Sequence, residues 1–238
     1  YQLLSPEYNI VRSPRSYNSQ IGVPLSVWQI NESHTLAIFE PGISVPAEME
    51  KLAAIIRPTT AILTNLGEAH NEGFIDYAHK FSEKLKLFIG CEAVIARRKE
   101  IHVGKEVLEA ELKTKFYTWG LAAGNDFTVD EIRKGSGEAL IRIIYNNKQV
   151  TYNIPFTDEA SIENSISCCC MMLHLGYTTD VISERIGKLH AVEMRLQQKK
   201  GVNNSYIIND SYSNDPYSLS IALDYLKQQA GDNKTTVI

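Results

Sequence analysis

The feature that most constrains this fold is the alternation of short apolar segments with amphipathic helical segments between residues 35 and 119. The apolar segments resemble strands and cover residues 35–39, 60–65, 93–96 and 115–119. Strands that are apolar on both faces are typical of a parallel sheet covered by helices on both sides. The order therefore predicts an α/β fold with a mostly parallel sheet, of the doubly wound or nucleotide-binding type.

Helices are predicted between these strands. Ser44 is predicted to cap the first of them, which carries Pro46 in its first turn and ends before Pro58. Two more are predicted over residues 77–88 and 105–112.

The pattern changes after residue 126. Three segments, residues 127–132, 139–145 and 149–154, predict an antiparallel meander, with Asn146 and Asn147 as the last turn. Helices over 159–175, ended by Gly176, and over 179–189, capped by Thr178 or Thr179, follow.

A new unit is predicted after the basic stretch 197–201. A strand over 206–208, a helix from Pro216 and a strand from Thr235 would form the start of a βαβ unit. We therefore predict one domain over residues 1–196 and the beginning of a second over 197–238. Since the sheet of the second is incomplete, we expect the chain to be a fragment.

Composition excludes several classes of function. The formal charge of the 238 residues is -4, and no basic patch suits a nucleic acid. No apolar run approaches the roughly 20 residues of a membrane span, and no signal peptide is visible. Cys91 and the consecutive Cys168, Cys169 and Cys170 fit neither a disulfide framework nor a zinc site, which favours buried thiols in a reducing cytoplasm.

Polar residues follow two of the predicted strands. Glu40 ends one of them, and His70 lies just beyond the end of another. Ligands bind at this edge of parallel sheets, and a carboxylate with an imidazole could hold a divalent cation there. Solvated surface groups are the alternative.

Lys84 borders the apolar stripe that Tyr77, Phe81, Leu85 and Phe88 form on their predicted helix. A partly buried lysine has a lowered pKa, and its neutral amine can react with carbon dioxide. The alternative is a surface lysine that covers apolar groups with its aliphatic chain. Residues 209–216 join a strand to a helix and could grip a ribose or phosphate, or could be a helix start that Asp215 caps.

Several motifs, taken together, resemble the Mur ligase family. These motifs span nearly the whole chain and follow the order that they have in the family. They are residues 17–25, Glu40-Pro41-Gly42, residues 64–74, Glu163-Asn164, residues 193–196 and residues 209–216. The resemblance implies a P-loop NTPase-like central domain and the start of a Rossmann-like C-terminal domain.

The resemblance also implies roles for matching residues. They are Glu40 and His70 as magnesium ligands, Lys84 as a carbamylated lysine that binds a second magnesium, Asn164 as the adenine contact, Arg195 near the ATP γ-phosphate, and Asp210 at the ribose. Lys84, His70 and Arg195 would be the catalytic residues, and ATP and Mg²⁺ the cofactors.

The branch of the family that looks most similar adds D-Ala-D-Ala to UDP-MurNAc-tripeptide through an acyl phosphate. Residues 68–74 look like the type that is fused to an alanine racemase in some bacteria. The chain contains no phosphate-loop motif, and the resemblance implies that this loop lies before Tyr1, so we expect the fragment alone to be inactive. Ala160, where the family usually has His, and Pro41 depart from the family pattern.

Two alternatives stay open. One is a sister amide ligase, such as another Mur enzyme or a folylpolyglutamate synthetase. The other is a non-catalytic scaffold that kept the fold and lost the phosphate loop.

Overall fold

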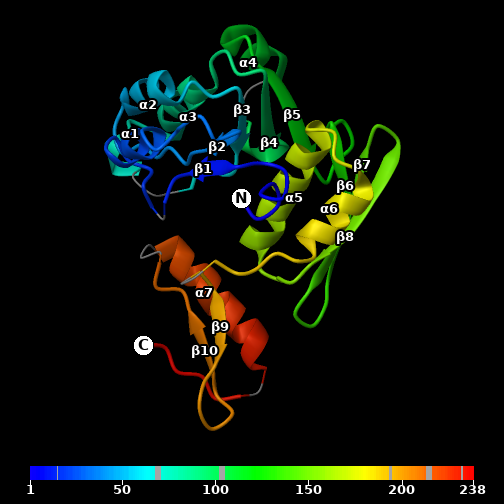
Figure 1. Cartoon of the computed structure of the whole chain (residues 1–238). Coiled ribbons are helices and arrows are strands. Elements are labelled where there is room, and N and C mark those ends of the chain that lie inside the picture. Colours follow the sequence, from blue (N-terminus) through cyan, green and yellow to red (C-terminus); the bar gives the residue numbers. More distant parts are fainter. Residues whose placement is uncertain (15, 68–70, 102–104, 193–194, 213–215, 232) are drawn as a thin grey trace.

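The computed structural model describes residues 1–14, 16–67, 71–101, 105–192, 195–212, 216–231 and 233–238 (Figure 1). The strands are β1 (Ile10–Arg12), β2 (Leu36–Ile38), β3 (Thr60–Leu63), β4 (Ala93–Arg97), β5 (Lys115–Gly120), β6 (Phe127–Lys134), β7 (Ala139–Tyr145), β8 (Lys148–Ile154), β9 (Gln197–Lys200) and β10 (Tyr206–Asn209). The α-helices are α1 (Gly22–Val27), α2 (Glu48–Ile56), α3 (Tyr77–Leu85), α4 (Lys105–Leu112), α5 (Glu159–His174), α6 (Thr179–Ile186) and α7 (Pro216–Ala230). Short 3₁₀ helices are η1 (Asn71–Gly73), η2 (Lys86–Phe88) and η3 (Arg98–Glu100).

The largest sheet has the strand order β3-β4-β5-β6-β7-β8. Neighbours from β3 to β6 are parallel, and β6, β7 and β8 are antiparallel. The predicted parallel sheet is confirmed for the strands at 60–65, 93–96 and 115–119, and the predicted meander continues it. The strand predicted at 35–39 forms as β2 but does not join this sheet. Strands β1 and β2 form a separate parallel pair.

The strand β4 shows why the central segments are apolar throughout. Its first four residues have no exposed surface. Successive side chains of a strand point to opposite faces. Ile95 accordingly packs with α5 and α6 on one face, and Val94 and Ala96 pack with α3 on the other. Figure 1 shows α2 and α3 on one side of this sheet and α5 and α6 on the other.

The meander is buried on one face only. In β7, Ala139, Ile141 and Ile143 are fully buried on one face, whereas Ile144, on the opposite face, is exposed. The turn between β7 and β8 has positive φ at Asn146 (49°) and Asn147 (60°), as the predicted hairpin turn requires.

The start of α2 differs from the prediction. The helix begins at Glu48 rather than near Pro46, and Ser44 does not cap it with its side chain. Instead the Glu48 carboxylate accepts hydrogen bonds from the backbone N–H groups of Ser44 (2.7 Å) and Val45 (3.1 Å). These two N–H groups precede the helix. The N–H of the N-cap residue Ala47 donates to the Glu83 carboxylate at 2.6 Å, so an orphan donor at the helix start is paired without a serine side chain.

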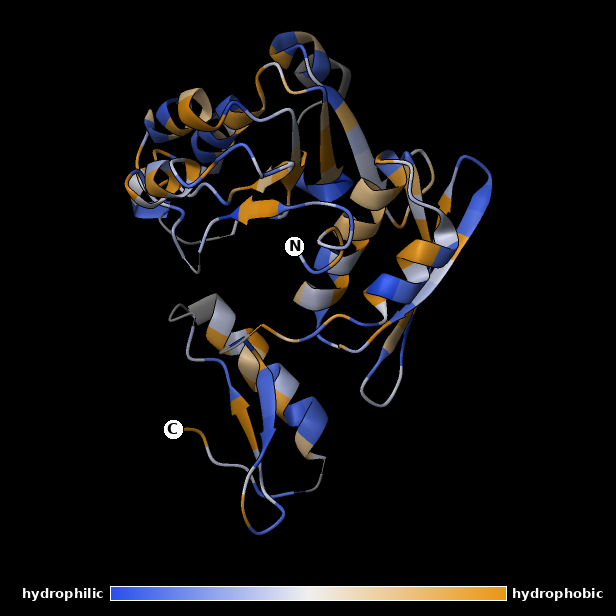
Figure 2. Cartoon of the chain, in the orientation of Figure 1, coloured by the Kyte–Doolittle hydropathy of each residue, from blue (hydrophilic) through white to orange (hydrophobic). Residues whose placement is uncertain are grey.

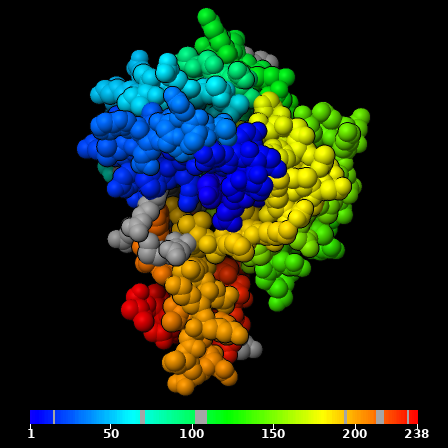
Figure 3. All heavy atoms as spheres, in the orientation of Figure 1, coloured from blue at the N-terminus to red at the C-terminus, as the bar shows by residue number. Residues whose placement is uncertain are grey.

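The N-terminal residues pack against the end of α6. The Arg185 guanidinium forms an ion pair with Glu7 and donates a hydrogen bond to the Leu3 carbonyl at 2.8 Å. The Gln2 side chain and the His190 backbone exchange two hydrogen bonds. Figure 3 shows the first residues (blue) lying against the α6 region (yellow).

The C-terminal residues form β9, β10 and α7. The basic stretch, for which no helix or strand was predicted, is the strand β9, antiparallel to β10. Figure 2 shows β9 as hydrophilic and β10 as largely hydrophobic. Lysines are common on edge strands because they discourage pairing with other chains. The strand predicted from Thr235 is wrong, because residues 234–238 pair with no strand of the described chain.

The four cysteines are free, and Cys91, Cys169 and Cys170 are buried. None of the helices in the described part of the chain combines the length and hydrophobicity that crossing a membrane requires.

Candidate functional site

Glu40 lies two residues past the carboxyl end of β2, as predicted. Its carboxylate accepts a hydrogen bond from the Asn18 side chain at 3.3 Å, and its backbone N–H donates to the Ser13 hydroxyl at 3.2 Å. Ser13 directly follows β1. The ends of β1 and β2 and the segment around Asn18 therefore meet at one edge, with an exposed carboxylate among them.

The segment after β3 carries the other predicted metal ligand. Leu66 and Gly67 on one side of it and Asn71 on the other are described. His70 lies outside the described residues, together with Glu68 and Ala69. The predicted meeting of Glu40 and His70 therefore stays a prediction.

Lys84 lies on α3 and is half-buried. Its Nζ donates a hydrogen bond to the Leu66 carbonyl at 3.4 Å, so the amine lies beside the segment that follows β3. Burial lowers the pKa of the Lys84 amine, the charge of Lys80 lowers it further, and Glu100 opposes both effects. A lowered pKa favours the neutral amine. The predicted stripe is confirmed at Phe81, Leu85 and Phe88, whereas Tyr77 is 43% exposed.

Lys80 is a residue that the sequence analysis missed. Only 1% of it is exposed. Its Nζ donates hydrogen bonds to the Gly67 carbonyl at 2.9 Å and to the Asn71 side chain at 2.8 Å. Lys80 thus links the two described sides of the segment after β3. The available signal was its position on the apolar stripe, three residues after Tyr77 and next to Phe81.

Glu100 binds the same segment from η3. Only 7% of this residue is exposed, and its carboxylate accepts a hydrogen bond from the Leu66 N–H at 3.4 Å. The backbone of Leu66 therefore contacts Glu100 through its N–H and Lys84 through its carbonyl.

Asn164 lines a small notch at the carboxyl edge of the large sheet. The notch has a volume of about 30 Å³, and its lining residues are Thr64, Asn65, Trp119, Ala160, Glu163, Asn164 and Ser167. They come from the end of β3, from β5 and from the first half of α5. This is the edge at which open parallel sheets bind ligands. Asn164 thus lies at the ligand-binding edge, and its contact with adenine stays a prediction.

Arg195 and Asp210 lie near each other at the entry to the C-terminal unit. The Asp210 carboxylate accepts a hydrogen bond from the Leu196 N–H at 2.9 Å. The Arg195 guanidinium lies 4.3 Å from the centre of the Tyr212 ring. Both predicted residues therefore take part in the contacts between the connection at 195–196 and the segment after β10. The predicted cap Asp215 lies outside the described residues.

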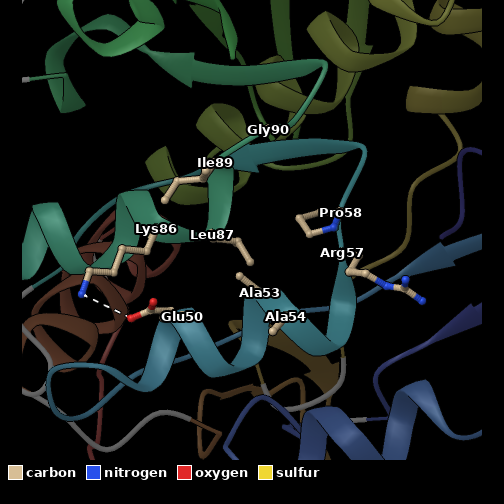
Figure 4. Close-up of a pocket in the computed structure, with 9 residues that line it drawn as sticks. All are labelled: Glu50, Ala53, Ala54, Arg57, Pro58, Lys86, Leu87, Ile89 and Gly90. Carbon is tan, nitrogen blue, oxygen red and sulfur yellow. Dashed lines mark ion pairs between the residues drawn. The ribbon is translucent and has the colours of Figure 1, made fainter. Parts of the chain in front are cut away.

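A larger pocket, of about 460 Å³, lies elsewhere (Figure 4). Its lining residues are Glu50, Ala53, Ala54, Arg57, Pro58, Lys86, Leu87, Ile89 and Gly90. Pro58 precedes β3 and Gly90 precedes β4, so the pocket opens at the amino edge of the sheet. It contains none of the predicted site residues, and ligands of parallel sheets bind at the opposite edge. We therefore place the candidate site at the carboxyl edge.

The described residues contain no cluster of three or more His, Cys, Asp and Glu side chains that could hold a metal ion. A protein site for Mg²⁺ needs fewer ligands, because this ion keeps several waters and binds one or two carboxylates together with substrate phosphates. The exposed carboxylate of Glu40 is a hard oxygen donor beyond the carboxyl end of β2. The donor chemistry therefore fits Mg²⁺.

Comparisons with known proteins show the family and the fold of the chain. The Mur ligase middle domain family matches residues 1–172. UDP-N-acetylmuramoyl-tripeptide–D-alanyl-D-alanine ligase of Bacillus subtilis is 23% identical over 241 residues, which cover 100% of this chain and 51% of that protein. MurF from Acinetobacter baumannii has the same fold, with a TM-score of 0.84 and 21% identity over 96% of this chain and 50% of that chain. MurF ligase from Thermotoga maritima, solved in complex with ADP, has a TM-score of 0.76 and 21% sequence identity, over 95% of this chain and 52% of that chain.

The chain spans about half the length of the curated relatives it matches. The family match covers well over half of the chain and includes the elements that carry Glu40, Lys84 and Asn164. The resemblance seen in the sequence is confirmed, and the chain belongs to the Mur ligase family through its middle domain.

Proposed function

We propose that the full-length protein is an ATP-dependent ligase that adds D-Ala-D-Ala to UDP-MurNAc-tripeptide in the synthesis of peptidoglycan precursors, in the cytoplasm. The observation that carries this proposal is the match of the whole chain to a Bacillus subtilis protein named for that reaction. The ADP complex of the Thermotoga maritima protein supports the use of ATP.

The reaction has two steps. A carboxylate oxygen of the tripeptide attacks the γ-phosphorus of ATP, and the bond from that phosphorus to ADP breaks to give an acyl phosphate. The amine of D-Ala-D-Ala then attacks the acyl carbon, loses a proton and displaces phosphate. In this proposal Asn164 contacts the adenine, Asp210 the ribose and Arg195 the γ-phosphate. The position of Asn164 in the notch supports its part in this arrangement.

In this proposal Lys84 is carbamylated, and its partly buried position favours that reaction. In its neutral form the amine would bond to carbon dioxide and release a proton, which gives a carbamate with two oxygens. Burial, which lowers the pKa of Lys84, supports this reaction. Glu40 and His70 would hold one Mg²⁺, and the carbamate of Lys84 would hold a second. When bound, Mg²⁺ neutralises charge on the transferred phosphoryl group.

The proposed domain organisation rests on the same family match. Residues 1–196 would form the central ATPase-type domain and residues 197–238 the start of the C-terminal domain. A fusion to an alanine racemase is part of the proposal for the full-length protein. The 238 residues contain no phosphate-loop motif, so the experiments below use the full-length protein.

The test is ligation by the purified full-length protein. UDP-MurNAc-tripeptide, D-Ala-D-Ala, ATP and magnesium are incubated with it, and the product is identified by its mass while ADP is measured separately. We expect the pentapeptide product and one ADP for each peptide bond. Addition of an amino acid to another UDP-MurNAc precursor, or of glutamate to a folate, would instead indicate a sister ligase. No ligation with any of these substrates would indicate a scaffold.

Variants on α3 test the role of Lys84. Lys84→Ala should abolish ligation, and short carboxylic acids should restore part of it by supplying the missing oxygens. Lys86→Ala is the matched control, because Lys86 lies on the following turn and pairs with Glu83 at 2.7 Å. Full activity of Lys84→Ala without added acid would show that no carbamate is needed.

A further inference from the structure

Beside the notch, an ion pair joins β4 to α5. Arg97, the last residue of β4, pairs through Nη1 with Oε1 of Glu163 on α5. The Arg97 guanidinium also lies 5.2 Å from the centre of the Trp119 ring. Only 16% of the Arg97 side chain and 22% of the Glu163 side chain are exposed. The pair is thus largely removed from solvent, at the edge where Asn164 lies.

The backbone of Glu163 is held as well. The Ser167 hydroxyl donates to the Glu163 carbonyl at 3.1 Å and accepts a hydrogen bond from the Trp119 indole N–H at 3.1 Å. The Trp119 ring, which lies against the Arg97 guanidinium, is therefore hydrogen-bonded through Ser167 to the turn of α5 that contains Glu163. Side chains with so many contacts keep one geometry, and they orient a ligand without a large loss of entropy on binding.

Among the described residues, the polar contacts of the Glu163 carboxylate involve one of its two oxygens. Arg97 contacts Oε1, and Lys99 Nζ lies 3.7 Å from that same atom. Within the described part of the chain, Oε2 has no hydrogen-bond partner. Glu163 and Asn164 both line the notch. A clamped carboxylate therefore presents a second oxygen next to a side-chain amide.

An ionised carboxylate only accepts hydrogen bonds, whereas an amide side chain both donates and accepts them. The 6-amino group of adenine donates. Hypoxanthine and guanine have a carbonyl oxygen at that position, which a carboxylate repels. We propose that Glu163, held by Arg97, selects adenine over 6-oxopurines by accepting a hydrogen bond from the 6-amino group. This inference rests on the proposed function, which places the base of ATP at Asn164.

The proposal predicts a difference between nucleotides. A site that is built to bond a substrate N–H discriminates strongly against an analogue without it, and a hydrogen bond to a charged group is worth about 10- to 100-fold in affinity. The full-length protein should therefore prefer ATP to inosine triphosphate by about 10- to 100-fold in kcat/KM. Purine riboside triphosphate, which has hydrogen in place of the amino group, should lie between them.

Three variants test the assignment. Glu163→Gln, whose amide can turn to face either type of base, should reduce the preference for ATP over inosine triphosphate to less than about 3-fold. Arg97→Met should weaken the preference, because it releases the Glu163 carboxylate without removing it. Arg98→Met is the matched control, since Arg98 is exposed and its guanidinium bonds the Ile101 carbonyl at 3.4 Å, and it should keep the wild-type preference.

Equilibrium binding of ATP and inosine triphosphate is measured beside ligation, which separates this inference from the proposed function. If ligation of D-Ala-D-Ala fails but Glu163→Gln removes a binding preference for ATP, the proposed function is wrong and the assignment of Glu163 holds. If Glu163→Gln and Arg97→Met weaken ATP and inosine triphosphate by the same factor, the ion pair only ties β4 to α5 and the inference is overturned. A wild-type protein without preference overturns it as well.

Discussion

Replacement of the buried Lys80 by methionine tests how the segment after β3 is held. The two hydrogen bonds from Lys80 to Gly67 and Asn71 involve a charged donor, and bonds of this kind contribute about 1.5–3 kcal/mol each. Burial of an ammonium costs several kcal/mol, and methionine, which fills a similar volume, does not have this cost. Asn71 is exposed and regains water when the lysine is lost.

The opposing terms leave a net destabilisation of about 1–3 kcal/mol for Lys80→Met, because the lost bonds outweigh the relieved desolvation. Equilibrium urea unfolding, followed by circular dichroism and by the fluorescence of the buried Trp119, measures this change. Lys188→Met is the control: Lys188 is 70% exposed and pairs with Glu184 one turn away, so we expect no measurable change. A Lys80→Met protein that is more stable than wild type would refute the argument, since the buried charge would then be a net cost that its partners do not offset.

Further predictions concern single positions. Burial raises the pKa of the Cys91 thiol to about 11, so its alkylation by iodoacetamide at pH 8 should be at least about 100-fold slower than that of a thiol at the usual 9.0, and unfolding in urea should abolish the difference. Because the folded pKa is the higher one, the free energy of unfolding should also fall as the pH rises from 9 to 11. Asn147→Val places a β-branched residue at φ 60° and should cost about 1–2 kcal/mol in urea unfolding. Gly176→Ala, at φ 86°, should cost about 1 kcal/mol in the same assay, and unchanged stability would show that the chain end of α5 relaxes freely.

The fold was largely predictable because its signals are local. The first four residues of β4 are apolar because both faces of the strand are covered, and burial alternates along β7 because one of its faces is covered. The two asparagines at 146–147 predict their turn because this residue type tolerates positive φ. Each of these patterns is complete within a few consecutive residues.

Errors arose where the partner was distant or the signal was weak. The strand β9 has two glutamines and two lysines and no apolar residue, so only its pairing with β10 makes it a strand. The strand predicted from Thr235 has the right composition and no partner in the described chain. At the start of α2, the Ala47 N–H donates to the carboxylate of Glu83, which lies 36 residues further along the chain, so no local pattern predicts this contact.

The site was predictable only in part, for a similar reason. Glu40, Lys84 and Asn164 were chosen one at a time, from strand ends, a helix face and a resemblance. Arg97, Trp119 and Glu163 meet because β4, β5 and α5 end or begin at the same edge, and no spacing in the sequence relates them. The buried position of Lys80 was not predicted because lysines are usually exposed, although its position on an apolar stripe indicated burial.

The helix α3 links stability and function in one element. Its apolar side chains Phe81 and Leu85 anchor it in the core beside β4, so its orientation relative to the sheet is fixed. Two lysines one turn apart then reach the backbone at 66–67, where Lys84 bonds Leu66 and Lys80 bonds Gly67. Burial of two cations so close together is unfavourable unless carbonyls and carboxylates compensate, and Glu100 supplies one such charge. A positive charge on Lys80 lowers the pKa of Lys84, so the residue that holds the segment also favours the neutral amine that the proposed carbamate requires.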